Sequence, residues 1–244
     1  MPSYSSYKQI ADKLADISGD IVRSYFRTNM GVSYKKDSSP VTEADRLTEK
    51  AIRKAIGLHY PNHGIIGEEF GHSNLNAEYI WVIDPIDGTK SFATGKPIFC
   101  TLISLCRNKI PILGIIDQPI LNERWFGISG EPTTHNGKII STRSCSQISD
   151  SWLSATSPDM FRGQNNDSFN KLRGKVKHTT YGGDSYAYGL LAQGFSDIIC
   201  EAMLKPYDYC ALVPVVEGAG GKISDWTGKP LDLDSDGKVV ATGD

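Results

Sequence analysis

The sequence predicts a mixed α/β protein whose first half, residues 1–140, is α+β and whose second half, residues 141–244, is α/β. Two segments near the N-terminus repeat apolar residues at helical spacing, and a series of short apolar runs follows them. After about Ser141 short strands alternate with helical segments, which is typical of α/β folds. We expect the two halves to form one compact unit.

Two helices are expected at the start of the chain. The first is predicted from apolar residues that recur at helical spacing, namely Ile10, Leu14, Ile17, Ile21 and Tyr25, with Ser3, Ser5 and Ser6 as candidate caps. A polar connection over residues 35–41 leads to Thr42, which with Asp45 resembles a capping box that opens a second helix. The buried face of this helix is expected to contain Ala44, Leu47, Ala51, Ile52 and Ala55.

The rest of the first half is expected to be mostly sheet. A break at Pro61–Gly64 precedes a short strand, Ile65-Ile66, which ends at Gly67-Glu68-Glu69. A second apolar run, Trp81–Ile83, ends at Asp84. Further strands are predicted over residues 99–105, 112–116, 124–128 and 138–140, the last of them after the tight-turn pair Asn136-Gly137.

The second half reads as strands and helices in alternation. Strands are predicted over residues 152–156, 176–178, 197–200, 222–224 and 239–241. Helices are predicted over residues 167–173, 185–193 and 207–218, and residues 158–166 are expected to be a mobile loop. The chain ends at Asp244.

Composition narrows the functional classes. The net charge of −2 and the pI of about 6.2 provide no field that would gather nucleic acid or an anionic membrane surface. Five cysteines without a C-x-x-C pair predict neither a disulfide framework nor a zinc site, which favours a reduced, cytoplasmic compartment. The sequence shows neither a leader peptide nor an apolar run of membrane length, so we expect a soluble, unexported protein.

Acidic residues stand where predicted strands or helices begin or end: Glu68, Glu69, Asp84, Asp87 and Asp208. Each has an ordinary interpretation, as a turn residue, a solvated loop charge or a carboxylate at a helix N-terminus. Taken together, the five acidic residues suggest a cation site. Carboxylates that lie close together raise each other's pKa unless a cation neutralises them. Oxygen donors without His or Cys favour Mg²⁺, Mn²⁺ or Ca²⁺ over zinc, and Mg²⁺ suits a site shared with waters and a phosphate.

The motifs that contain these residues resemble those of the inositol monophosphatase superfamily. They are Gly67-Glu68-Glu69, Asp84-Pro85-Ile86-Asp87-Gly88-Thr89, Tyr207-Asp208 followed by Ala211, and Glu217–Gly221. Other segments resemble its histidinol-phosphatase branch, among them Gly95-Lys96-Pro97, Thr156–Asp159 and Tyr181–Asp184. The inositol enzymes usually have Thr-Asn-Phe where this chain has Lys90-Ser91-Phe92, and Trp where it has Tyr207. Relatives usually continue beyond the last strand through a further helix.

This resemblance implies a Mg²⁺-dependent phosphatase with a layered αβαβα sandwich, expected as a homodimer. Two or three Mg²⁺ ions are implied, with Mn²⁺ as a substitute. The implied ligands of one ion are Glu68, Asp84 and the carbonyl of Ile86, and those of a second are Asp84, Asp87 and Asp208. The implied catalytic residues are Glu68, Asp87 and Thr89, of which Glu68 and Thr89 orient the attacking water. Backbone N–H groups of Gly88, Thr89 and Lys90 are expected to bind the phosphate, provided that they open a helix.

The substrate is expected to be a small phosphorylated alcohol. Asp184, Ser185 and Glu201 resemble residues that line the pocket for its alcohol part. Two carboxylates there suit the cationic amine and imidazole of L-histidinol phosphate better than a neutral polyol. Alternatives are an inositol-1-monophosphatase, a broad-specificity sugar or polyol phosphatase, and a non-catalytic metal-binding relative. Asp184 could also merely cap a helix that begins at Ser185.

Overall fold

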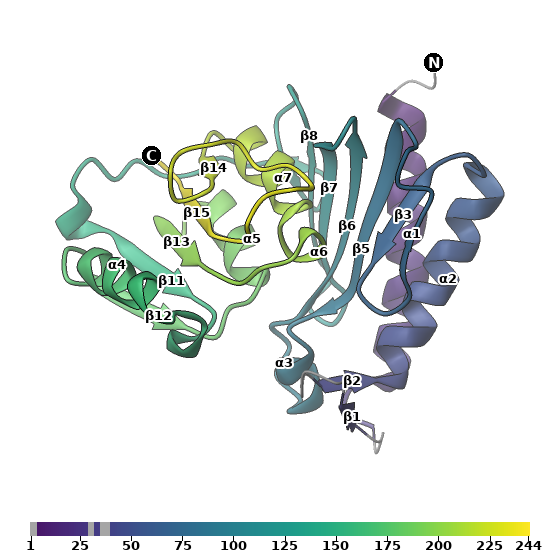
Figure 1. Cartoon of the computed structure of the whole chain (residues 1–244), viewed down its shortest axis with the longest axis horizontal. Helices are drawn as coiled ribbons and strands as arrows, with labels where there is room; N and C mark the ends of the chain where they lie inside the picture. The colour runs from purple at the N-terminus through teal and green to yellow at the C-terminus, as the bar shows by residue number, and fades with distance from the viewer. Residues whose placement is uncertain (1–3, 29–31, 35–39) are drawn as a thin grey trace.

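The computed structural model describes residues 4–28, 32–34 and 40–244, and it folds as five alternating layers of helices and sheets (Figure 1). The outer helices α1 (Tyr4–Tyr25) and α2 (Glu43–His59) cover one face of a larger sheet. Three helices, α5 (Tyr186–Ala192), α6 (Pro206–Tyr209) and α7 (Leu212–Gly218), lie between this sheet and a smaller one. Helix α4 (Gln164–Arg173) covers the far side of the smaller sheet. The predicted mixed α/β class is confirmed.

The larger sheet is antiparallel except where β3 pairs in parallel with β5. Its order across the sheet is β10 (Lys138–Ile139), β9 (Thr134–His135), β8 (Glu123–Ile128), β7 (Ile110–Gln118), β6 (Cys100–Arg107), β5 (Tyr79–Asp87), β3 (Gly64–Gly67) and β4 (Gly71–Ser73). Strand β5 therefore runs inside the sheet between β6 and β3; its pairing with β3 ends at Ile83, and its last residues pair with β6.

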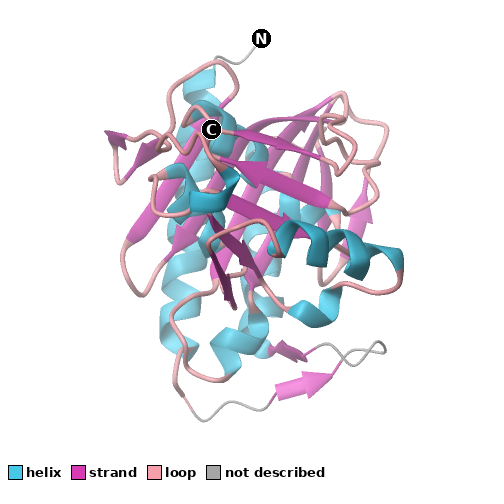
Figure 2. Ribbon diagram, turned by 90° about the vertical axis from the view of Figure 1, so that its left-hand side faces the viewer, coloured by secondary structure: helices cyan, strands magenta, loops and turns pink. Residues whose placement is uncertain are grey.

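The smaller sheet combines parallel and antiparallel pairs. Its order is β12 (His178–Tyr181), β11 (Trp152–Ala155), β13 (Ile198–Glu201), β15 (Val239–Thr242) and β14 (Lys222–Ser224). Short elements complete the chain: β1 (Val32–Tyr34), β2 (Pro40–Thr42), α3 (Thr89–Ala93), and the 3-10 turns η1 (Ile148–Asp150) and η2 (Pro158–Met160). Figure 2 shows the helices and strands from a second direction, turned by 90° about the vertical axis.

Strand β5 contributes to both large apolar cores. Trp81 and Ile83 point into the core shared with α1 and α2, whereas Ile80 and Val82 point into the core shared with α5, α6 and α7. Because side chains alternate along a strand, a strand buried on both faces reads as one continuous apolar run. Burial on both faces makes β5 a rigid support for the residues at its end.

The capping box at the start of α2 is confirmed, but the predicted buried face of this helix is partly wrong. The Thr42 and Asp45 side chains bond each other's backbone N–H groups. Leu47 is exposed, and three polar residues share the buried face with Ala44, Ile52 and Ile56, namely Asp45, Thr48 and Glu49. An apolar pattern cannot predict burial of carboxylates whose partners lie on other elements.

Two predicted elements of the second half differ from the structure. The helix predicted over residues 207–218 is divided into α6 and α7, because Pro214 has no N–H to donate to the carbonyl of Cys210. The strand predicted over residues 176–178 lies at His178–Tyr181 instead. The loop predicted over residues 158–166 contains η2 and the start of α4.

Some expectations concern residues outside the described part of the chain. Ser3 as a cap and most of the polar connection, residues 35–39, are among them. Among the helices of the described residues, none is long and apolar enough to cross a membrane.

His63 lies half-buried in an aromatic cluster and binds the indole of Trp81. Its ring stacks on Tyr60 at 4.5 Å between centroids and on Tyr79 at 5.1 Å. The indole N–H of Trp81 donates to Nδ1 of His63 at 3.2 Å, so this nitrogen must be unprotonated for the bond to exist. Burial lowers the pKa of His63, which keeps the ring neutral in the folded protein.

We therefore expect His63 to destabilise the fold in acid. Its folded-state pKa lies below the unfolded value of about 6.5, so the unfolded chain binds more protons and the free energy of unfolding falls as pH drops from about 7 to 5. The His63→Gln variant keeps an acceptor for Trp81 and should flatten this slope by a fraction of one bound proton. Urea unfolding at several pH values measures the free energy of unfolding and hence its slope against pH. The exposed His59→Gln control should keep the wild-type slope, and an unchanged slope in His63→Gln would contradict the prediction.

Candidate active site

Asp84 and Asp87 lie at the end of β5, where its pairing with β6 becomes irregular. The register shifts between these two residues, because Pro85 has no N–H for the ladder. The N–H of Ile86 donates instead to Oδ1 of Asp84 at 3.1 Å, and the hydroxyl of Thr101 donates to the carbonyl of Pro85 at 2.8 Å. The irregular strand end directs both carboxylates to one place.

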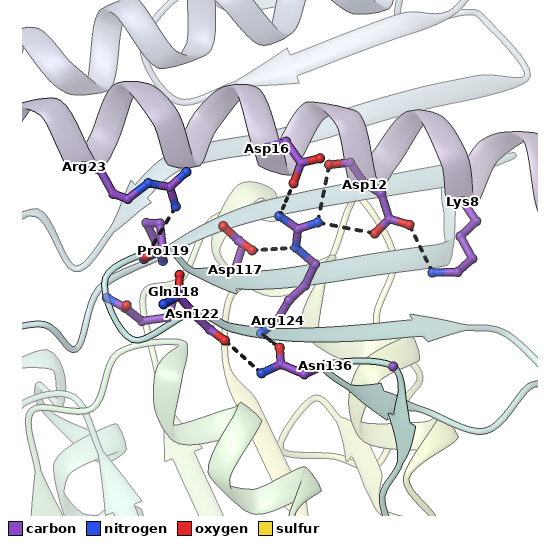
Figure 3. Close-up of a pocket in the computed structure, with 11 residues that line it drawn as sticks. Lys8, Asp12, Asp16, Arg23, Asp117, Gln118, Pro119, Asn122, Arg124 and Asn136 are labelled. Atoms are coloured by element: carbon purple, nitrogen blue, oxygen red, sulfur yellow. Dashed lines mark hydrogen bonds and ion pairs between the residues drawn. The ribbon is translucent and has the colours of Figure 1, made fainter.

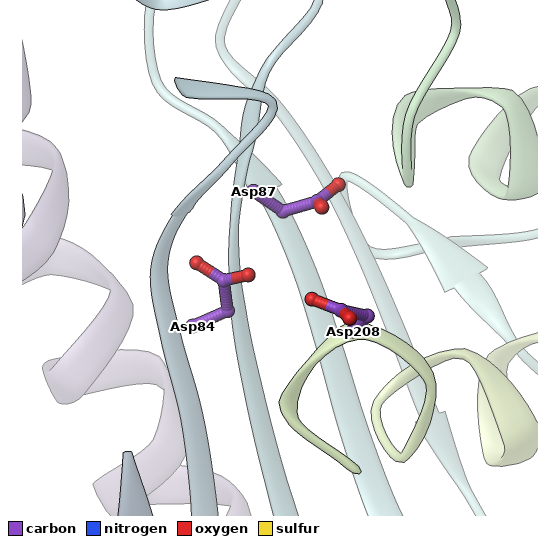
Figure 4. A group of neighbouring side chains, drawn as sticks. All are labelled: Asp84, Asp87 and Asp208. Atoms are coloured by element: carbon purple, nitrogen blue, oxygen red, sulfur yellow. The ribbon is translucent and has the colours of Figure 1, made fainter. Parts of the chain in front are cut away.

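Asp208 reaches the same place from α6, which packs against β5. Its Oδ2 accepts the N–H of Lys205 at 2.6 Å, so Asp208 does serve as a carboxylate at a helix start. Each of Asp84, Asp87 and Asp208 also offers an oxygen within 4.8 Å of those of the other two (Figure 4). Asp208 is therefore both a carboxylate at a helix start and a member of the acidic group that could hold a metal ion.

Burial and neighbouring carboxylates raise the pKa of all three aspartates. Burial, followed by the charges of Glu68, Asp87 and Asp208, raises the pKa of Asp84 well above its usual range. Burial and the charges of Asp87 and Glu68 raise the pKa of Asp208 well above its usual range. Burial and the charge of Asp184 raise the pKa of Asp87 to about 7. A cation would remove this repulsion, and the donor set consists of hard oxygens. The residues therefore fit a divalent ion such as Mg²⁺.

Glu68 stands at the end of β3, beside the three aspartates. Its backbone N–H donates to the carbonyl of Ile83 on β5 at 3.3 Å, which continues the pairing of the two strands. The charge of Glu68 contributes to the raised pKa values of Asp45, Asp84 and Asp208, which indicates that its side chain faces this group. The predicted neighbourhood of Glu68, Asp84, Asp87 and Asp208 is thus present in the structure.

Helix α3 begins at Thr89, directly after Asp87. Gly88 caps it with φ of 86°, a left-handed conformation that favours glycine. The helix is short, but its first N–H groups lie where a helix start leaves backbone donors available. The sequence prediction that Gly88, Thr89 and Lys90 open a helix is met.

Asp45 is a buried residue of this site to which sequence reasoning assigned only a capping role. The hydroxyl of Thr89 lies 3.0 Å from the carbonyl of Ile86 and 3.4 Å from Oδ1 of Asp45. Burial raises the pKa of Asp45, which the donors of Thr42 partly offset. The capping box identified Asp45, but only the tertiary structure places it against Thr89.

A cavity of about 130 Å³ adjoins the aspartates and contains the predicted substrate residues. Ser185 donates its backbone N–H to Oδ2 of Asp87 at 2.7 Å, and the hydroxyl of Ser91 lies 3.4 Å from Oδ2 of Asp184. Burial and the charge of Glu201 raise the pKa of Asp184 to about 6. The lining residues include Asp87, Thr156, Asp184, Ser185, Tyr188, Glu201 and Asp208.

Glu201 is buried at the floor of this cavity and is held by three donors. Its Oε1 accepts from the N–H and the hydroxyl of Thr156 at 3.0 and 2.5 Å, and its Oε2 accepts from the hydroxyl of Tyr188 at 3.0 Å. Burial raises the pKa of Glu201 to about 7 even so. Thr156 and Tyr188 were not among the predicted site residues; their place in the cavity lining and their contacts with Glu201 identify them.

The alternative role for Asp184, as a helix cap, is not supported. The N-cap of α5 is Ser185, which forms no side-chain capping bond. Asp184 has φ of 42°, a conformation that is uncommon for a residue other than glycine. Its carboxylate instead rests beside Gly88, where an added Cβ would approach Asp184 Oδ2 to 2.9 Å. This strained backbone aims the carboxylate at the cavity.

A larger hollow of about 510 Å³ lies between α1 and the end of β7 (Figure 3). Its central residue is Arg124, which pairs with Asp16 at 2.8 Å and with Asp117 at 2.6 Å. The charged groups of this hollow are engaged with each other and join α1 to the sheet. The candidate active site is therefore assigned to the smaller cavity, whose lining contains four acidic residues, Asp87, Asp184, Glu201 and Asp208.

Comparisons with known proteins agree with this geometry. The sequence model of the inositol monophosphatase family matches residues 3–244. The chain is 50% identical over 238 residues to the bifunctional phosphatase IMPL2, chloroplastic, of Arabidopsis thaliana, which covers 97% of this chain and 69% of that protein. It is 33% identical over 235 residues to the histidinol-phosphatase of Chlorobaculum parvum, and the match covers 96% of this chain and 91% of that protein. A solved inositol monophosphatase from Zymomonas mobilis is similar at 45% identity and a TM-score of 0.91, covering 100% of this chain and 95% of that one.

Proposed function

From the premise that this chain belongs to the inositol monophosphatase family and is a phosphatase, we propose that it hydrolyses L-histidinol phosphate with the help of Mg²⁺. The observation that carries the proposal is the convergence of Asp84, Asp87 and Asp208 beside a cavity lined by two further acids, Asp184 and Glu201. The first group suits a metal-bound phosphate, and the second suits a cationic alcohol.

The proposed metal ligands are the side chains of Glu68, Asp84, Asp87 and Asp208 together with the carbonyl of Ile86. Two or three Mg²⁺ ions, or Mn²⁺ in their place, would supply an activated water and charge stabilisation for the departing oxygen. The raised pKa values of Asp84 and Asp208 support this assignment, because repulsion among the carboxylates weakens when a cation is bound.

The protein's own groups would position the water and the phosphate. The hydroxyl of Thr89 donates towards Ile86 or Asp45, which leaves its oxygen able to accept a hydrogen bond from the attacking water. Glu68 would hold the same water from the other side. The N–H groups of Gly88, Thr89 and Lys90 would bind phosphate oxygens at the start of α3. Asp87 is fixed by the N–H of Ser185, which joins this centre to the substrate cavity.

The substrate assignment rests on the acidic cavity and on a relative named histidinol-phosphatase. A cationic amine or imidazole would be attracted by Asp184 and Glu201, whereas a neutral polyol would offer them no opposite charge. The second candidate is an inositol monophosphatase, which the Zymomonas mobilis structure favours by its identity of 45%.

Phosphate release from L-histidinol phosphate and from myo-inositol 1-phosphate, measured side by side, tests the substrate assignment. We expect kcat/KM to be at least about tenfold higher for histidinol phosphate, which corresponds to about 1.4 kcal/mol of binding in the transition state. Similar values for the two substrates would indicate a broad-specificity phosphatase. Metal binding without any phosphate release would indicate the non-catalytic relative.

The Asp184→Asn variant tests the role of the cavity carboxylate. We expect kcat/KM for histidinol phosphate to fall by about 10- to 100-fold, because a charge-assisted contact with the substrate is lost. The value for inositol phosphate should change less. The exposed Asp150→Asn serves as a matched control, because Asp150 lies in the η1 turn and does not line this cavity. Equal losses for both substrates would assign Asp184 to the metal centre rather than to substrate choice.

A cytoplasmic location, a homodimer and a single compact unit of two halves also belong to the proposal. All five cysteines are free thiols, which suits a reducing compartment. Helix α7 of the second half packs on β7 and β8 of the first, which supports one compact unit. Light scattering of the purified protein measures the oligomeric state directly.

A further inference from the structure

Glu49 is a buried carboxylate on α2 to which the chemistry proposed above gives no role. Its side chain is fully removed from solvent. Its Oε2 accepts the N–H of Glu69 at 2.7 Å, and its Oε1 accepts the N–H of Phe70 at 3.2 Å and Nε of Arg53 at 2.7 Å. A buried charge is tolerated only when partners satisfy it. The side chain of Glu49 therefore holds the turn after β3 through the N–H groups of Glu69 and Phe70.

This turn carries Glu68, a proposed metal ligand. On one side the N–H of Glu68 donates to Ile83 of β5 at 3.3 Å. On the other side, the next two N–H groups of the chain, those of Glu69 and Phe70, donate to the carboxylate of Glu49. Residue 67 must be glycine for this approach, because an added Cβ would overlap the Glu49 carboxylate. The backbone of Glu68 is thus clamped between β5 and α2.

The same face of α2 also supports Thr89. Asp45 lies one helical turn before Glu49, and side chains four residues apart share a helix face. Asp45 contacts the hydroxyl of Thr89, while Glu49 holds the turn of Glu68. Figure 1 shows α2 running alongside β3 and β5 and reaching α3 through β2. One rigid helix therefore supports both groups that are proposed to orient the attacking water.

We propose that Glu49 is a positioning residue that fixes Glu68 for cation binding; this inference rests on the proposed function. Three donors converge on its two oxygens: two backbone N–H groups and one guanidinium. A carboxylate accepts all three, whereas an amide of the same shape would turn its own NH₂ towards at least one of them. The turn would then shift, and Glu68 would move with it.

The Glu49→Gln variant tests this proposal through its response to Mg²⁺. We expect the Mg²⁺ concentration for half-maximal phosphate release to rise by about 10- to 100-fold, as for other residues that support metal ligands. KM for the substrate at saturating Mg²⁺ should stay near the wild-type value. Calorimetric titration of the metal-free protein with Mg²⁺ alone should show that the Kd for Mg²⁺ rises by a similar factor. The control is Glu43→Gln, an exposed position on the first turn of the same helix.

A purely structural role predicts a different result. Glu49→Gln would then melt at a lower temperature but keep the wild-type Mg²⁺ dependence, and that outcome would overturn the proposal. If this variant fails to fold, Arg53→Met keeps the carboxylate and removes one of its donors, and it should raise the Mg²⁺ requirement by a smaller factor. An unchanged requirement in Arg53→Met would likewise count against the role. A wild-type enzyme that ignores Mg²⁺ would instead refute the proposed function itself.

Discussion

Replacement of Asp87 by Asn is expected to reduce phosphate release by about 10³-fold or more, since a lost metal ligand removes several kcal/mol of charge stabilisation and each 1.4 kcal/mol is a factor of ten. Asp87 belongs to the proposed metal group and also lines the substrate cavity. Phosphate release at saturating Mg²⁺ and substrate measures the loss.

The same substitution should leave the fold intact. The carbonyl oxygen of Asn can still accept the N–H of Ser185, which lies 2.7 Å from Oδ2 of Asp87. Removing one of several repelling carboxylates should also keep or raise the melting temperature of the metal-free protein, because burial and neighbouring charge already raise the pKa of Asp87 to about 7. The exposed Asp150→Asn is the matched control. Turnover near the wild-type level in Asp87→Asn would exclude the proposed metal role.

Chelation of divalent ions is expected to abolish activity, and added Mg²⁺ should restore it in full. A ligand that binds only the folded state also stabilises it, by about 2.7 kcal/mol at a concentration one hundred times its Kd. The stabilisation should be marked here, because Asp84, Asp87 and Asp208 repel each other when no cation lies between them. Thermal unfolding of the metal-free protein with increasing Mg²⁺ measures this effect.

Asp87→Asn connects the two experiments. Its melting temperature should rise less with Mg²⁺ than that of the wild type, since one ligand has been removed. Ca²⁺ is a useful comparison, because it binds oxygen donors but prefers more ligands at longer distances. Activity that survives exhaustive chelation, with metal content confirmed by elemental analysis, would contradict metal-dependent catalysis by this site.

The sequence predicted most of the regular elements because their signals are local. Strand β5 reads as an apolar run because it is buried on both faces, and the capping box of Thr42 and Asp45 marks the start of α2 within four residues. The division between α6 and α7 was missed, although Pro214 was visible in the sequence. Short strands such as β4 and β9 were missed because a few paired residues carry no periodic pattern.

The polar support of the site was beyond sequence reasoning. Asp45, Glu49 and Thr48 interrupt the apolar face of α2 and would ordinarily be assigned to solvent, as Leu47 was assigned to the core. Glu49 can be buried because the N–H groups of Glu69 and Phe70 donate hydrogen bonds to its carboxylate. Partners of this kind lie on other elements, and their distance in sequence hides them.

The sequence by itself determined the elements and placed Glu68, Asp84 and Asp87 at strand ends, because helical and strand periodicities and turn residues act over a few positions. The motifs around these residues also determined the family. Only the tertiary structure decided that Asp208 meets Asp84 and Asp87, and that Asp184 and Glu201 share a cavity with Asp87 and Asp208. The physical reason is that convergence depends on the packing of α6 against β5 and of α5 between the two sheets, which burial of distant apolar surfaces fixes.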